Sequence, residues 1–122
     1  MQEERVDEVG RKIELAWLTA FYGGLLTDKQ RQVLTLHCEE DLSLAEIAQE
    51  AGVSRQGVHD MLTRAAQRLF DMEDKLGMAA RFRNMEDGLE RCRNLLKEKR
   101  YDEAEGVIDT LIRFDQEENN GL

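Results

Sequence analysis

The sequence predicts an all-α protein, and three observations support this fold class. The chain contains no proline, the residue that most strongly disrupts the interior of a helix. It is rich in Ala, Leu, Glu, Lys, Arg and Gln, which all have high helix propensity. No run of alternating apolar and polar residues between turn signals predicts a strand. We therefore expect a helical domain over residues 1–76 and a C-terminal helical extension or hairpin over residues 77–122.

The composition is that of a soluble, acidic chain. Its 26 acidic and 17 basic side chains give a formal net charge of −9. The acidic first residues, MQEERVDE, differ from the basic start of a signal peptide. The longest uncharged run, Leu15 to Thr27, is shorter than the roughly 20 residues that span a bilayer. These features predict a cytoplasmic protein with no membrane partner.

An apolar stripe with the spacing of one buried helical face predicts the first helix. The stripe consists of Ile13, Ala16, Trp17, Ala20 and Phe21. Trp17 and Phe21 could also form a platform on which bases stack, but their helical spacing favours core positions. We expect Gly23 and Gly24 to end this helix in a left-handed cap.

Two capping boxes predict the next two helices. Thr27 with Gln30, and Ser43 with Glu46, have the spacing in which a hydroxyl accepts from the N3 amide while the N3 side chain returns to the cap. The helices are predicted over residues 28–38 and 44–50. Their inward-facing residues are expected to be Val33, Leu34, His37, Leu44, Ile47 and Ala48.

The segment "LSLAEIAQEAGVSRQGVHDMLTRAAQRLF" meets the local requirements of a helix-turn-helix. Ala48 is small enough for two helices to cross closely, and Gly52 can adopt the positive φ of the turn. Val53 is expected to lie beneath the turn, and Ser54 to cap the second helix. An ordinary helical hairpin is the alternative, which the identity and spacing of these residues disfavour. The residues expected to dock the second helix on the core are Val58, Met61 and Leu62.

The outward face of that second helix is the predicted nucleic-acid interface. Arginine and glutamine suit the edges of guanine and adenine in the major groove, and the first amides of a helix suit phosphate. Asp60 is discordant, because it could accept from a cytosine amine, pair with Arg64 or repel phosphate; we favour the pair with Arg64. The predicted binding residues are Ser54, Arg55, Gln56, His59, Thr63, Arg64 and Arg68.

Beyond Phe70 the pattern stays helical, with a break expected at Gly77 and a second candidate break at Gly88. Asp102 is a candidate N-cap after a tight turn. Residues 81–100 hold seven basic and four acidic side chains, whereas residues 101–122 hold one and seven. The acidic segment could fold on the basic one or cover the arginines of the interface, although solvated surface charge explains it more simply. The two apolar stripes expected here are Met85, Leu89, Cys92 and Leu96, and Ala104, Val107, Ile108, Leu111 and Ile112.

Nothing in the sequence predicts catalysis, a cofactor or a metal. Cys38 and Cys92 are far apart and, with His37 and His59, lack the spacing of a metal site. There is no glycine-rich phosphate loop and no nucleophile with a placed base. We therefore expect no enzymatic activity.

The segment "LLTDKQRQVLTLHCEEDLSLAEIAQEAGVSRQGVHDMLTRAAQRLFDMEDKLGM", with "ELAWLTAFYGGLL" before it, resembles the YlxM-type family of small bacterial helix-turn-helix proteins. It is also similar to region four of sigma factors. The resemblance covers about Ile13 to Met78, and the chain after about Arg83 lies outside it. It implies an all-α helix-turn-helix bundle, no enzymatic activity, nucleic-acid binding through residues from Ser54 to Arg64, and a regulatory role in the signal recognition particle pathway.

Three functional hypotheses remain from the sequence. The first is a regulator whose helix enters the major groove of DNA. The second is an adaptor of the signal recognition particle that binds its RNA or its GTPase, and the third is a structural helical protein without a ligand. A homodimer, formed through Trp17 and Phe21 or through the C-terminal stripes, would strengthen a single weakly binding module.

Overall fold

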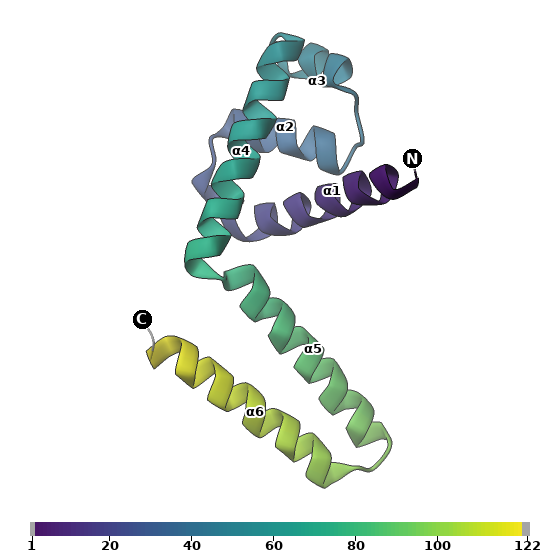
Figure 1. The fold of residues 1–122 in the computed structure, drawn as a ribbon, viewed down its shortest axis with the longest axis vertical. Coiled ribbons are helices and arrows are strands. Elements are labelled where there is room, and N and C mark those ends of the chain that lie inside the picture. Colours follow the sequence, from purple (N-terminus) through teal and green to yellow (C-terminus); the bar gives the residue numbers. More distant parts are fainter. Residues whose placement is uncertain (1, 121–122) are drawn as a thin grey trace. The chain divides into compact units, whose positions relative to one another are not determined.

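A computed structural model of the chain describes the backbone of residues 2–120 and the side chains of residues 8–114 and 116. These residues form six α-helices and one short 3-10 helix, with no strand among them (Figure 1). The all-α prediction is therefore confirmed. The elements are α1 (Gln2–Tyr22), η1 (Gly23–Leu25), α2 (Asp28–Cys38), α3 (Leu44–Ala51), α4 (Arg55–Leu76), α5 (Met78–Lys97) and α6 (Tyr101–Asn120).

The chain divides into two compact units, Met1–Ala79 and Ala80–Leu122. In the first unit α4 is the long helix against which α1, α2 and α3 pack (Figure 1). Helix α4 ends at the predicted break, where Gly77 adopts a left-handed φ of 61° and its amide bonds to the Glu73 carbonyl. The division into a domain over residues 1–76 and an extension or hairpin over residues 77–122 stays a prediction.

The larger core cluster of the first unit joins α1, α2 and α4. Trp17 and Phe21 pack against its edge as a T-shaped pair with ring centroids 5.2 Å apart, which agrees with their predicted place in the core. Ile13, predicted inward, is instead 66% exposed. It lies two residues from buried Leu15, and residues two apart point to nearly opposite sides of a helix. The buried members are Leu15, Leu18, Tyr22, Leu26, Leu34, Ala65, Ala66, Leu69 and Ala79.

A second core cluster holds α2, α3 and the start of α4 together. The predicted inward residues Leu44 and Ala48 are partly buried at its edge. His37 is half-buried rather than fully inward. The buried members are Val33, Leu36, Ile47, Ala51 and Val58.

Gly23 and Gly24 do not form the predicted left-handed cap. After Tyr22 the chain enters the 3-10 helix η1, whose end is marked by the Leu26 amide bonding to the Gly23 carbonyl at 3.1 Å. Gly23 is buried, and a Cβ there would lie 3.1 Å from the Thr19 methyl group. The position needs a small residue because of close packing.

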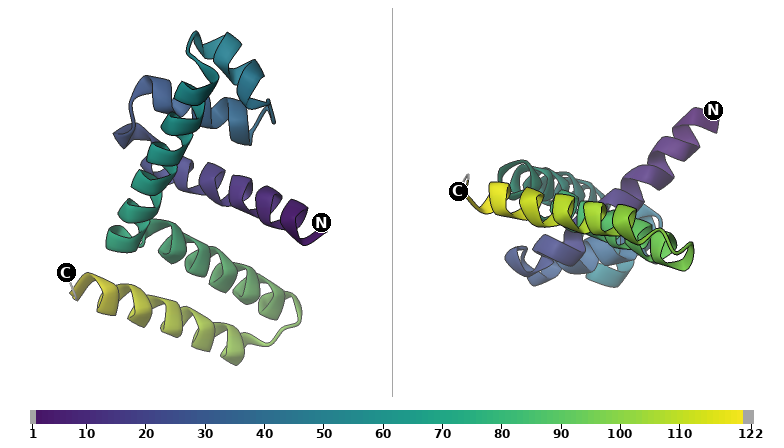
Figure 2. Two further views of the ribbon diagram at one scale, coloured as in Figure 1. Left: turned by 45° about the horizontal axis from the view of Figure 1, so that its top comes forward. Right: turned by 90° about the horizontal axis from the view of Figure 1, so that it is seen from below.

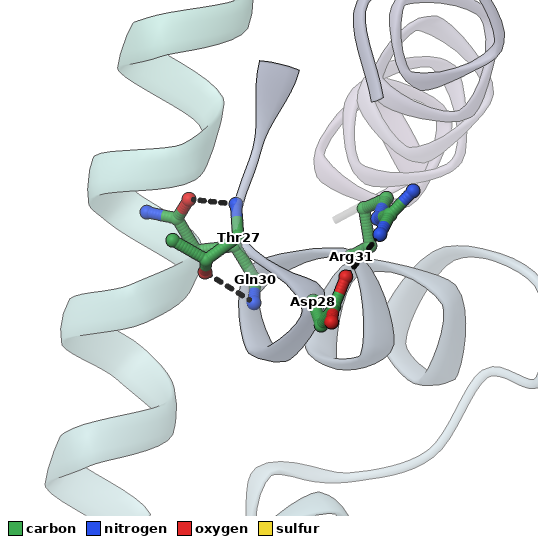
Figure 3. A network of polar contacts seen from close by, with 4 residues as sticks. All are labelled: Thr27, Asp28, Gln30 and Arg31. Carbon is green, nitrogen blue, oxygen red and sulfur yellow. Dashed lines mark hydrogen bonds and ion pairs between the residues drawn. The ribbon is translucent and has the colours of Figure 1, made fainter. Parts of the chain in front are cut away.

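Both predicted capping boxes are present. Thr27 Oγ1 accepts from the Gln30 amide at 3.1 Å, and Gln30 Oε1 accepts from the Thr27 amide at 3.0 Å (Figure 3). Ser43 and Glu46 form the same reciprocal pair. The amide and hydroxyl of Ser43 hold the pKa of the Glu46 carboxyl below its usual range. The predicted starts of α2 and α3 are thereby confirmed.

The second unit is a hairpin of α5 and α6, which run in opposite directions (Figure 2). Lys99, with φ of 61°, makes the turn, and the Arg100 amide bonds to the Leu95 carbonyl at 2.9 Å. Asp102 is therefore not the predicted N-cap, because α6 already begins at Tyr101. Gly88 does not break α5 either; a Cβ there would lie 2.5 Å from Leu111, so glycine permits the two helices to approach.

Candidate nucleic-acid interface

The α3–α4 segment has the geometry of a helix-turn-helix. Gly52 caps α3 with a left-handed φ of 70°. The amides of Gly52 and Val53 both donate to the Ala48 carbonyl, at 3.0 and 3.1 Å, which closes the turn. Val58 is fully buried, and Met61 and Leu62 pack against the same cluster. The predicted motif is therefore confirmed residue by residue.

Ser54 fixes the start of α4. Its Oγ accepts a hydrogen bond from the Gly57 amide at 2.9 Å, as predicted for an N-cap. Residue N3 is Gly57, so no side chain returns to the cap as Gln30 and Glu46 do in α2 and α3. The amides of the first turn of a helix have no partner within the helix. The entrance to α4 is consequently less obstructed than the entrances to α2 and α3.

A lysine contact that the sequence did not predict steadies the motif. Lys29 Nζ, on α2, donates a hydrogen bond to the Ala51 carbonyl at the C-terminal end of α3. A cation at this end of a helix also interacts favourably with the helix dipole. The orientation of α3 is thereby tied to α2, and no sequence motif links two residues this far apart.

All seven predicted binding residues lie on the exposed surface of α4 or at its cap. Arg55, Arg64 and Arg68 take part in no ion pair or hydrogen bond with any residue that the structure describes. By contrast Arg31 pairs with Asp28 (Figure 3). At about 1.5 Å per residue, Arg55 and Arg64 are roughly 13 Å apart along the helix axis. The three guanidinium groups are thus available but widely spaced.

Other predicted residues already have partners inside the chain. Thr63 Oγ1 donates to the His59 carbonyl at 2.9 Å, as helical threonines often do. Gln56 Nε2 donates to Asp60 Oδ1 at 3.1 Å. The predicted Asp60–Arg64 pair is therefore wrong: Asp60 turns toward Gln56 and His59, whose Nδ1 lies 3.6 Å from it. Arg64 pairs with none of the residues that the structure describes.

The same glutamine–aspartate contact recurs further along α4. Gln67 Nε2 donates to Asp71 Oδ1 at 2.9 Å. Asp60 and Asp71 are separated by about three helical turns, so they lie nearly in line on one face. The i, i+4 spacing could have revealed both pairs. The exposed face of α4 therefore presents carboxylates as well as guanidinium groups.

The described part of the chain shows neither a candidate metal site nor a helix that could span a membrane. No group of three or more His, Cys, Asp or Glu side chains there could hold a metal ion. None of the described helices combines the length and apolar character needed to cross a bilayer.

Comparison with known proteins gives the family. The model of UPF0122, described as "Putative helix-turn-helix protein, YlxM / p13 like", matches residues 9–108. The chain belongs to the UPF0122 family. This match confirms the predicted relationship and corrects its extent, because it continues past Met78 through α5 and into α6.

Individual UPF0122 proteins align over most of the chain. A UPF0122 protein of Desulforamulus reducens is 46% identical over 79 residues, which cover 65% of this chain and 68% of the relative. One of Clostridium kluyveri is 38% identical over 103 residues, covering 84% and 93%. One of Bacillus mycoides is 37% identical over 101 residues, covering 81% and 92%. Because the family model matches residues 9–108, α5 is part of the family's common region.

Proposed function

We propose that this UPF0122 protein is a nucleic-acid-binding regulator whose α4 helix enters the major groove of duplex DNA. The observation that carries the proposal concerns Arg55, Arg64 and Arg68 on the second helix of a helix-turn-helix: they are exposed and form no ion pair or hydrogen bond with the described part of the chain. Unpaired guanidinium groups can bind phosphate or guanine without first breaking an intramolecular ion pair.

The N-terminal half of α4 supplies the proposed contacts with bases. Arg55, Gln56 and His59 lie in its first turns and are exposed. Gln56 retains its carbonyl oxygen as an acceptor while its amide donates to Asp60. The Ser54 hydroxyl supports this end by capping the helix. Thr63, Arg64 and Arg68 follow further along the helix. There, the sugar-phosphate backbone of the DNA is easier to reach than the base edges.

Electrostatics predicts weak binding by a single copy. Three arginines neutralising three phosphates give a slope in log K against log salt of about −2.7. The formal net charge of −9 repels polyanions at long range. Useful affinity therefore requires direct base contacts, a second copy or a partner surface.

An adaptor in the signal recognition particle pathway is the second candidate. The carboxylates of Asp60 and Asp71 on the exposed face of α4 favour a protein surface, such as the particle's GTPase, over a continuous phosphate backbone. The particle's RNA would be bound mainly through phosphates and single-stranded elements, because the deep, narrow major groove of an RNA helix resists an inserted helix.

Titrations against three partners distinguish these functions. Labelled duplex DNA, the signal recognition particle RNA and its GTPase are each titrated at several salt concentrations. Arg55→Ala and Arg64→Ala test the α4 face, and Arg91→Ala on α5 is the matched control for loss of one positive charge. Weaker binding by the α4 variants alone supports the interface. Binding of every partner by Arg55→Ala and Arg64→Ala at wild-type strength contradicts it.

A further inference from the structure

The α5–α6 hairpin buries little of its own apolar surface. From Ala80 onward, its buried side chains among the described residues are Cys92, Leu95 and Ala104. From Leu89 onward, five large apolar side chains are instead 42–60% exposed. We call these five the hairpin seam: Leu89, Leu96, Tyr101, Ile108 and Ile112.

The residues of the hairpin seam share one face of the hairpin. An open groove on the hairpin is lined by Asp87 and Arg91 of α5 and by Glu103 and Thr110 of α6, so these four mark one face. At about 100° per residue, the seam residues of each helix lie roughly on the opposite side from these groove residues. The apolar stripes of both helices therefore meet on the other face.

The spacing of the seam is that of a helix–helix interface. On α5, Leu89 and Leu96 are seven residues apart, and on α6 Tyr101, Ile108 and Ile112 are spaced by seven and four. This is the heptad pattern whose side chains interdigitate with those of another helix. A hairpin with such a seam is half of a four-helix bundle.

We propose that the hairpin seam pairs with the hairpin seam of a second copy of this chain. Five large side chains at about half exposure leave on the order of 500 Å² of apolar surface per copy. Two copies together thus reach about 1,000 Å² before the polar edges are counted, which is the lower limit for a specific interface. An isologous pairing needs no surface beyond the seam itself.

Charge selects the arrangement of the two hairpins. Residues 81–100 carry seven basic and four acidic side chains, and residues 101–122 carry one basic and seven acidic. The exposed edge of α5 beside the seam includes Arg93 and Lys97, and that of α6 includes Glu105 and Asp109. A two-fold axis parallel to the helices places α5 of each copy against α6 of the other, and like charges are then separated.

The test is the oligomeric state of the full chain without nucleic acid, measured by sedimentation equilibrium over a concentration series. Leu89→Glu and Ile108→Glu each place a charge in the seam, and Asn94→Glu, on an exposed part of α5 away from the seam, is the matched control. We expect a dimer for the wild type and Asn94→Glu, and at least about tenfold weaker dimerisation for each seam variant. Far-UV circular dichroism measures the helix content of each variant. If a glutamate variant loses helix content, the milder substitutions Leu89→Ala and Ile108→Ala are used in its place.

Two results would overturn the proposal: a wild-type chain that stays monomeric, or a dimer that the seam variants leave unchanged. The second result would place the interface elsewhere, for example at Trp17 and Phe21. Added salt should weaken the dimer if α5 faces α6, whereas stronger association would contradict that arrangement. Because no nucleic acid is present, the outcome is independent of the function proposed for α4.

Discussion

Tyr22 Oη donates a hydrogen bond to Glu73 Oε1 at 2.6 Å and joins the end of α1 to the end of α4. The same two oxygens accept from the first two amides of α5: Met78 donates to Tyr22 Oη at 3.1 Å, and Ala79 to Glu73 Oε1 at 3.0 Å. The pair therefore caps α5 with side chains from two other helices. A carboxylate at this position also complements the positive end of the helix dipole.

Tyr22→Phe should destabilise the chain by about 1–3 kcal/mol, because the Met78 amide and Glu73 each lose a partner in a part-buried site. Urea unfolding measures the change. Tyr101→Phe removes a hydroxyl from a tyrosine that is 60% exposed and is the control. Equal stabilities of the two variants would show that the Tyr22 hydrogen bonds contribute no net stability.

Gly88→Ala and Gly106→Ala should change stability in opposite directions. A Cβ at Gly88 would lie 2.5 Å from Leu111, whereas a Cβ at Gly106 would meet nothing within 4 Å. Alanine at Gly106 should therefore stabilise α6 by about 0.5–1 kcal/mol, and alanine at Gly88 should cost about 1–3 kcal/mol through overpacking. Thermal unfolding of both variants is the measurement, and stabilisation by Gly88→Ala would mean that Leu111 moves aside without penalty.

Ser54→Ala should cost about 1 kcal/mol of unfolding free energy, because the Gly57 amide loses its acceptor. Thr63→Ala is the control, since that exposed hydroxyl bonds only to a helical carbonyl and alanine has the higher helix propensity. Chemical denaturation should rank Thr63→Ala at or above the wild type and Ser54→Ala below it. The reverse order would contradict the role of Ser54 as a cap.

Acidification through the titration range of histidine should destabilise the chain through His37. Burial, together with the nearby charge of Lys12, lowers the pKa of His37. The unfolded chain then binds the proton more readily than the folded one, so the stabilisation is present above the unfolded pKa of about 6.5 and lost as pH falls through the folded value. Unfolding free energies at about pH 7.5 and about pH 5.5 should differ less in His37→Gln than in the wild type. An unchanged difference would exclude His37 as the cause.

Features set by neighbouring residues were predictable from the sequence. The capping boxes at Thr27 and Ser43 and the positive φ at Gly52 depend on residues within four positions of each other. The exposure of the predicted α4 residues followed from helical period alone. Local chemistry therefore determines both the motif and its outward face.

Features set by distant packing were not predictable. The stripe beginning at Ile13 has helical spacing, but the centre of the face that packs against α2 and α4 runs through Leu15 and Leu18, and Trp17 and Phe21 lie at its edge. In the sequence Asp60 has two candidate partners four residues away, Gln56 and Arg64. Their spacing is the same, so it does not predict which of the two Asp60 contacts, and in the structure it is Gln56. The contact of Tyr22 with Glu73 spans 51 residues and has no local signal.

At Gly57, in the first turn of α4, helix stability and anion binding favour different residues. A glutamate at this position could complete a third capping box. It would also remove the cost of glycine in a helix, about 1 kcal/mol. Its Cβ would lie 3.0 Å from Ser54 Oγ, which would have to shift slightly. That carboxylate would also stand where an approaching anion needs free amides and would repel it. Greater rigidity and openness to a polyanion are thus incompatible at this one position, and the chain retains the residue that keeps the entrance open.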